Sequence, residues 1–184
     1  RRRDLPWLIA MGSISIGLFH VLWNTSVVSF GASIATVIQS NAPIFVTIIA
    51  WMVYNEPLTK RKLFAVALSV IGTIFCSGIT KSGAENFTTL GFLAALLSAI
   101  AYGTFPLFGR KLAGDYSPWT ILLYIFAFGT LTLLPFQFGR SLPASIPGNV
   151  IVYFVAFIFV STIGGFGFFT TALHHLQASI ASIT

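Results

Sequence analysis

LPWLIAMGSISIGLFHVLWNTSVVSFGASIATVIQSNAPIFVTIIAWMVYN, residues 5–55, is a run without a single Asp, Glu, Lys or Arg. As one helix it would be about 77 Å long, at a rise of 1.5 Å per residue. The apolar core of a bilayer is about 30 Å thick, so the run predicts two membrane-spanning helices joined by a turn. We expect the turn at residues 29–33, because Gly31 permits a sharp change of direction and Ser33 is a suitable N-cap for the next helix.

The rest of the chain has the same character. Hydrophobic residues make up 56% of the sequence and charged residues 8%, whereas a soluble domain has about 25% charged residues. Because lipid cannot pair with backbone N–H and C=O groups, apolar runs of this length must be helices or closed barrels. The run LFAVALSVIGTIF (residues 63–75) lacks the two-residue alternation of barrel strands. The sequence therefore predicts an all-α, polytopic transmembrane helix bundle.

The charge-free runs divide into six full spans and the beginning of a seventh. We expect the full spans at residues 5–28, 33–53, 63–80, 90–108, 118–138 and 149–173, with a turn and a truncated helix from residue 174 onward. Both ends of the chain are expected to be cuts within a longer protein, because it starts on Arg1 and stops inside an apolar run.

The basic residues test this layout. When the predicted loops alternate across the membrane, eight of the ten Lys and Arg residues fall on the side of the N-terminus: Arg1, Arg2, Arg3, Lys60, Arg61, Lys62, Arg110 and Lys111. Lys81 and Arg140 fall on the other side. The positive-inside rule then predicts an integral, multi-pass protein of a plasma (inner) membrane with Arg1–Arg3 in the cytoplasm. The net charge of +6 thus indicates the lipid bilayer as a partner, and nucleic acid is not expected as one.

Two segments of the chain are similar to each other. Residues 23–36 align with residues 169–182, and both contain the tetrapeptide Ala-Ser-Ile-Ala. By the predicted span count, the two copies lie at helix junctions of opposite orientation. Inverted repeats of this kind are typical of secondary transporters. A second pattern, Gly91, Ala95, Ala99 and Gly103 at intervals of four, predicts a face on which helix backbones approach closely.

Three motifs indicate a family. QSNAPIF (39–45), NEPLT (55–59) and IGT (71–73) resemble the EamA-type family of the drug/metabolite transporter superfamily. LGFLAALLSAIAY (90–102) is similar to the opening of the second repeat of that family. One departure is Ala65, where the family often has glycine.

The resemblance implies ten helices in two inverted five-helix repeats. Placed on that plan, residues 1–80 hold the last three helices of the first repeat, 81–89 the linker, and 90–184 the N-terminal part of the second repeat. It also implies that a substrate moves by alternating access through a central cavity, without covalent chemistry. We therefore expect a transporter and no enzyme.

Polar side chains within the predicted spans are the candidate substrate-binding residues, because they are costly in lipid unless they pair or face a cavity. They are His20, Trp23, Asn24, Gln39, Asn41, Tyr102, Thr170 and Thr171. His20 and Asn24 share one helix face and either line a cavity or form an interhelical hydrogen bond. Gln39 and Asn41 precede Pro43, which cannot donate a hydrogen bond to the Gln39 carbonyl. That carbonyl either faces a ligand or belongs to a kink satisfied by a neighbouring helix.

These features predict an exporter of small neutral or zwitterionic metabolites or drugs. The alternatives are an intramembrane enzyme that uses His20 or His174 with a serine, and a structural membrane subunit without transport. No cofactor or metal is expected, since the sequence lacks phosphate-binding, nucleotide-binding and zinc motifs. Protons are a candidate coupling ion, with His20 as the central ionisable group, and a homodimer is a candidate assembly. Glu56 is expected to cap a helix or to pair with Lys60.

Overall fold

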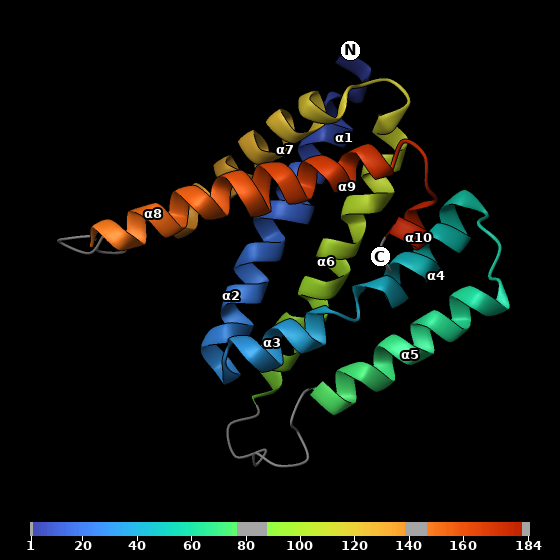
Figure 1. Ribbon diagram of the computed structural model, residues 1–184, viewed down its shortest axis with the longest axis horizontal. Coiled ribbons are helices and arrows are strands. Elements are labelled where there is room, and N and C mark those ends of the chain that lie inside the picture. The colour runs from blue at the N-terminus through green and yellow to red at the C-terminus, as the bar shows by residue number, and fades with distance from the viewer. Residues whose placement is uncertain (1, 77–87, 139–146, 182–184) are drawn as a thin grey trace.

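The computed structural model describes residues 2–76, 88–138 and 147–181, and the regular elements of these residues are all helical (Figure 1). Five helices are long and apolar enough to cross a membrane: Leu5–Phe30, Ala32–Tyr54, Thr89–Ala113, Pro118–Phe136 and Gly148–Ala172. The predicted all-α class is confirmed. The third predicted span corresponds to α5 (Lys60–Cys76), and its remainder, residues 77–80, lies outside the described residues. The count of six spans therefore stays a prediction.

Several of these helices consist of consecutive segments. The first joins α1 (Leu5–Ala10), the π-helical η2 (Met11–Leu18) and α2 (Phe19–Phe30), after a short 3-10 turn, η1 (Arg2–Asp4). The second comprises α3 (Ala32–Gln39) and α4 (Ala42–Tyr54). α6 (Thr89–Ala113) is continuous, and α7 (Pro118–Leu133) ends in the 3-10 turn η4 (Leu134–Phe136). The last joins α8 (Gly148–Ala156), the π-helical η5 (Phe157–Gly165) and α9 (Phe166–Ala172), before α10 (Ala178–Ala181).

The turn between α2 and α3 is made by one residue. Gly31 has φ +87° and ψ 158°, a region that is open essentially to glycine alone. The predicted position of the turn is confirmed. The predicted cap is wrong: α3 begins at Ala32, and Gly31 occupies the N-cap position. Because Gly31 reverses the chain in a single step, Ser33 is already inside the helix.

Replacing Gly31 with alanine is expected to destabilise the full-length protein by about 1–3 kcal/mol, the cost of holding a residue in a disfavoured backbone conformation. A Cβ atom at Gly31 would meet nothing within 4 Å, so the effect is one of backbone conformation alone. Gly114→Ala is the matched control, because its Cβ would also be in open space and its φ is −73°. Thermal unfolding in detergent measures both; equal losses would contradict the prediction.

α6 is the central helix, against which η2, α2, α3 and α4 pack. The small residues Gly91, Ala95, Ala99 and Gly103 are all buried, which confirms the predicted face of close approach. A Cβ on Gly91 would lie 2.4 Å from the Ser29 Cβ. The helix continues through Pro106 to Ala113, five residues beyond the predicted end of this span, because residues 109–113 contain no helix-breaking proline.

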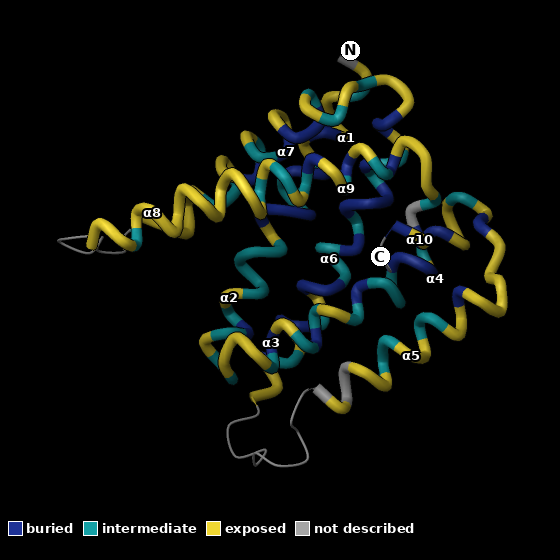
Figure 2. The backbone as a smooth tube through the Cα atoms, viewed as in Figure 1, coloured by how far each residue is buried: buried dark blue, intermediate teal, exposed yellow. Residues whose placement is uncertain are grey.

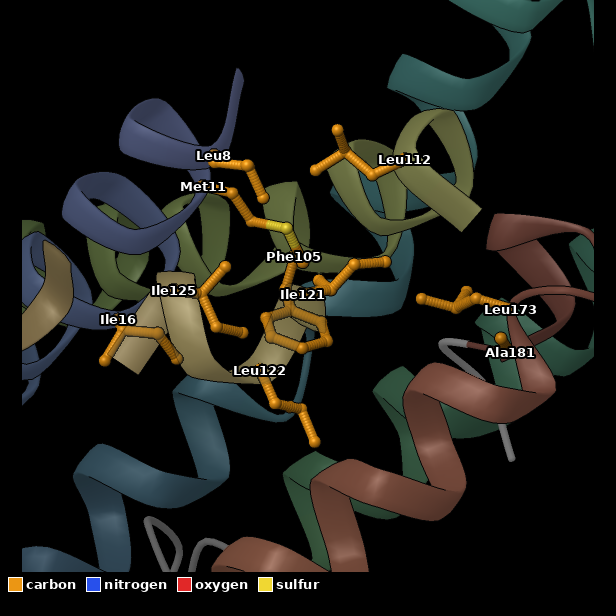
Figure 3. Packing of buried hydrophobic residues seen from close by; sticks show 10 residues of the cluster. All are labelled: Leu8, Met11, Ile16, Phe105, Leu112, Ile121, Leu122, Ile125, Leu173 and Ala181. Atoms are coloured by element: carbon orange, nitrogen blue, oxygen red, sulfur yellow. The ribbon is translucent and has the colours of Figure 1, made fainter. Parts of the chain in front are cut away.

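An apolar core joins the first helix, α6, α7 and the C-terminal segment. Met11 and Phe105 are 0% and 1% exposed, and Ile121 and Ile125 are 0% exposed. Figure 3 shows these side chains meeting between the helices. By contrast, α8 and η5 contain no buried residue and extend away from the bundle (Figures 1 and 2). Apolar side chains exposed along a helix of this length are compatible with lipid as the surrounding solvent.

The described basic residues gather at one end of the bundle. Lys111 lies 3.3 Å from the centre of the Trp7 ring, and the Tyr116 hydroxyl donates a 3.0 Å hydrogen bond to Asp4. Lys62 donates a 2.9 Å hydrogen bond to Gln177. These contacts bring the N-terminus and the connections after α4, α6 and α9 to the same end, here called the basic end. The turn between α2 and α3 lies at the opposite end (Figure 1).

Candidate functional site

A cavity of about 460 Å³ lies beside the middle of α6. Its wall combines residues from α3, α4, α5, α6, α9 and α10. The lining residues are Gln39, Ser40, Ala42, Pro43, Val46, Ser69, Tyr102, Gly103, Phe105, Pro106, Phe169 and Ala181. The sequence placed two of these, Gln39 and Tyr102, in the substrate site, and it also singled out Pro43 and Pro106.

The break between α3 and α4 forms one side of this cavity. α3 ends at Gln39 and α4 begins at Ala42, with Pro43 in its first turn. The side chains at the break satisfy the last carbonyls of α3: Ser40 Oγ donates to Thr36 O at 2.8 Å, and Asn41 Nδ2 donates to Ile38 O at 3.1 Å. The expected kink is thus a complete interruption, because Pro43 cannot donate to the Gln39 carbonyl. Broken helices of this kind line binding sites in transporters.

Aromatic rings form the facing wall. Phe105 and Phe169 are in contact at 5.7 Å between ring centres, and Tyr102 lies 5.2 Å from Phe19. Phe105 and Phe169 were not predicted as site residues, because phenylalanine is common throughout the spans. In the sequence, Phe105 precedes Pro106 and Phe169 precedes the candidate residue Thr170.

His20 lies next to this aromatic wall without lining the cavity. Its ring contacts Phe19 at 4.7 Å between centres, and Phe19 in turn contacts Tyr102. The His20 Nδ1 atom lies 2.7 Å from the Ile16 carbonyl, so this hydrogen bond is made within its own helix. The two arrangements that the sequence left open for His20 and Asn24, a cavity wall and an interhelical hydrogen bond, stay predictions.

The remaining predicted residues divide into two groups. Asn41 and Thr170 each neighbour residues that line the cavity, and both contain a buried oxygen without a hydrogen-bond partner among the described residues. The buried Thr47 hydroxyl is in the same situation. Trp23, Asn24 and Thr171 are not among the cavity-lining residues, and Asn24 and Thr171 are exposed.

None of the residues that line the cavity carries a formal charge. Within residues 2–76, 88–138 and 147–181, no three His, Cys, Asp or Glu side chains are grouped so that they could hold a metal ion. The chemistry that the cavity offers is therefore an amide, hydroxyl groups and aromatic faces. These groups bind neutral polar atoms by hydrogen bonds and apolar parts of a ligand by ring contacts.

An ionic cluster lies at the basic end. Glu56 is 3% exposed and accepts hydrogen bonds from Lys62, at 3.1 Å, and from Arg110 and Ser179. Burial raises the pKa of the Glu56 carboxyl, but the hydrogen bonds from Ser179 and Lys62 and the charges of Lys62 and Arg110 together hold it below its ordinary value. Glu56 therefore remains ionised at neutral pH.

The expected partner of Glu56 was wrong. Lys60 is exposed, and Lys62, two residues further along α5, reaches Glu56 instead. Arg110 and Ser179 are separated from Glu56 by 54 and 123 residues, so no local pattern in the sequence indicates them.

The two copies of Ala-Ser-Ile-Ala have the same local role. Each tetrapeptide begins a helix: α3 starts at Ala32, and α10 starts at Ala178. α3 follows the Gly31 turn, and α10 begins at the basic end, where Gln177 and Ser179 contact the ionic cluster. This arrangement agrees with the predicted inverted relation, which stays a prediction.

Comparison with known proteins identifies the family. The model of the EamA-like transporter family matches residues 1–78 and 89–184. An "Uncharacterized transporter" of Archaeoglobus fulgidus is 28% identical over 134 residues, which are 73% of this chain and 47% of that protein. A "Probable terminal-alkyne amino-acid exporter" of Streptantibioticus cattleyicolor is 26% identical over 80% of this chain and 47% of its own length. A "Probable amino-acid metabolite efflux pump" of Salmonella typhimurium is 23% identical over 90% of this chain and 60% of its own length. The chain thus spans about half the length of the curated relatives it matches.

Proposed function

This chain belongs to the EamA-like transporter family, and from that premise we propose that it forms the central part of an exporter of small neutral or zwitterionic metabolites. With five helices suited to cross a membrane, it is an integral, multi-pass membrane protein. The proposed transport follows alternating access, in which the cavity beside α6 opens in turn to the two sides of the membrane.

The uncharged cavity is the observation that carries the proposed substrate class. Gln39 offers both donors and an acceptor, and Ser40, Ser69 and Tyr102 offer hydroxyl groups. Phe105 and Phe169 supply apolar faces for the rest of the substrate. Two relatives are named as a probable amino-acid exporter and a probable amino-acid metabolite efflux pump. A zwitterionic amino acid has no net charge, and it fits a site that binds by hydrogen bonds and has no net charge of its own.

Flux measurements on the full-length protein in liposomes test this proposal. We expect efflux of at least one member of a panel of neutral amino acids, with Gln39→Ala lowering that flux about fivefold, since a hydrogen bond is worth about 1 kcal/mol. Tyr102→Ala is expected to have an effect at least as large, because it removes a ring and a hydroxyl. Gln137→Ala is the matched control, because Gln137 is exposed after η4. A panel that moves no faster than in empty vesicles would overturn the proposal.

The same liposomes address direction and coupling. We propose that the basic end faces the cytoplasm, since Lys and Arg are retained on that side of bacterial and eukaryotic membranes. Protons are the proposed coupling ion, with His20 beside the cavity wall as the group that would respond. Flux with and without an imposed pH gradient tests this, and equal rates in the two conditions would contradict it.

A further inference from the structure

The Glu56 cluster joins segments that are far apart in the sequence. Glu56 follows α4 and Lys62 lies in the first turn of α5, whereas Arg110 belongs to the last turn of α6 and Ser179 to α10. In the domain division predicted from the sequence, the first two residues lie in residues 1–80 and the other two in residues 90–184. The cluster is therefore a junction between the two predicted repeats.

The cluster lies directly on the basic side of the cavity. Pro106 and Ala181 line the cavity, and they are four residues before Arg110 on α6 and two residues after Ser179 on α10. Val46, which lines the cavity, packs with Ala50 and Leu107 in a small apolar cluster. Tyr54 packs against this cluster, and its hydroxyl donates a 2.7 Å hydrogen bond to the Leu107 carbonyl. α6 and α10 thus carry residues of both the cavity wall and the Glu56 cluster.

The charges of this cluster suit a contact that breaks and reforms. A buried ion pair gains little net stability over apolar residues, but it is strongly sensitive to the loss of one partner. Here one carboxylate holds two cations, so every contact of the cluster depends on Glu56.

Both cations also border hollows at the surface. Arg110 lines a hollow of about 610 Å³ with His174 and His175, and Lys62 lines one of about 690 Å³ with Lys60 and Arg61. Gln177 lies between the two and lines both. Separation of α10 from Glu56 would break the hydrogen bonds from Ser179 to Glu56 and from Lys62 to Gln177, while both ion pairs of Glu56 stay formed. Water from these hollows can replace the lost hydrogen bonds, which offsets part of their cost.

α10 (Ala178–Ala181) connects the C-terminal part of the chain to the first half. It packs against α4 and α6, Ser179 donates a hydrogen bond to Glu56, and Lys62 donates one to Gln177. Because a hydrogen bond depends steeply on distance and angle, a small displacement of α10 is enough to break these polar contacts.

We propose that the Glu56 cluster is the gate at the basic end of the cavity, closed in this structure by Ser179 and Arg110 and opened when α10 separates from Glu56. This inference rests on the proposed transport function, because it assigns the gate of that transporter. Its test is nevertheless independent of flux, because it measures access to the cavity.

The experiment measures cysteine accessibility in the full-length protein, with the native Cys76 replaced by serine. Ser69→Cys places a thiol on the cavity wall, and a membrane-impermeant maleimide is added from the basic side. Lys60→Cys, at an exposed position of α5, identifies the vesicles in which that side faces the reagent. We expect slow labelling of the cavity thiol in the parent. Glu56→Gln should accelerate it about a hundredfold, because it removes the charge that pairs with Lys62 and Arg110. Ser179→Ala should accelerate it about tenfold, because it removes one hydrogen bond to a charged group.

Asp4→Asn is the matched control, because it neutralises a carboxylate at the same end whose described partner is Tyr116. Its labelling rate should equal that of the parent. Unchanged labelling in both Glu56→Gln and Ser179→Ala would overturn the gate, and if Glu56→Gln does not fold, Ser179→Ala decides alone. Faster labelling of the Glu56→Gln and Ser179→Ala variants of a protein that transports no substrate would support the gate and refute the proposed function. Normal flux in the parent, with unchanged labelling in both variants, would support the proposed function and refute the gate.

Discussion

Replacing Gly12 with alanine is expected to destabilise the folded protein by about 3 kcal/mol, at the upper end of the cost of overpacking a core. An added Cβ atom would lie 2.7 Å from the Ile125 carbonyl oxygen and 2.7 Å from the Phe128 Cβ. The first of these is a backbone atom of α7, so the two helices would have to move apart. No rotation of a flexible side chain can relieve this contact.

The facing helix has the reciprocal arrangement. A Cβ on Gly129 would lie 2.6 Å from Ile16 Cγ2 and 3.2 Å from the Gly12 carbonyl oxygen. Gly12 and Gly129 thus set the distance between η2 and α7, which in turn holds Ile16, Ile121 and Ile125 in the buried core. Close approach through small residues is a major source of helix association in membranes, where the hydrophobic effect between helices is absent.

Gly72→Ala is the matched control for Gly12→Ala. Gly72 also lies inside a helix, but an added Cβ would meet nothing within 4 Å, and alanine is favoured over glycine in a helix by about 1 kcal/mol. We therefore expect Gly72→Ala to be neutral or slightly stabilising. Reversible unfolding of the full-length protein in mixed micelles measures both variants. Equal stabilities of Gly12→Ala and the parent would contradict the described packing of η2 on α7.

Replacing Glu56 with glutamine is expected to destabilise the folded protein by about 3–5 kcal/mol, the typical cost of removing one partner of a buried ion pair. Lys62 is 7% exposed, and the substitution leaves its ammonium group buried without the compensating charge. A second substitution, Lys62→Met, is expected to restore much of this loss in the double variant. The remaining cation, Arg110, is 34% exposed in its side chain and can be hydrated.

The dependence of stability on pH provides a further check on the Glu56 cluster. The pKa of Glu56 in the folded protein lies below its ordinary value of 4.5, so the folded state favours the ionised carboxylate. Its contribution is fully present above pH 4.5 and is lost as the pH falls through the lowered pKa. The difference in stability between the parent and Glu56→Gln should therefore shrink on acidification below pH 4.5. A difference that stays constant down to pH 3 would contradict the described ion pairs.

The site shows where local sequence patterns stop being informative. Gln39 and Tyr102 could be placed in the cavity because each lies four residues before a proline, Pro43 or Pro106. A proline has no N–H to donate to the carbonyl four residues before it. Asn24 was grouped with His20 by helical spacing, yet Asn24 is exposed and the His20 ring bonds to its own helix. In a span that is apolar on every side, no hydrophobic periodicity indicates which face points inward.

The sequence by itself determined the helical class and the positions of five apolar helices that are long enough to cross a membrane. Lipid imposes these features residue by residue, because it excludes charges and requires each backbone group to pair within its own segment. Only the tertiary structure decided that Ser69 and Phe169 line the same cavity as Gln39, and that Glu56 bonds to Arg110 and Ser179. These contacts depend on how each helix is rotated about its axis, and that rotation is set jointly by packing against several neighbours such as the glycines of η2 and α7.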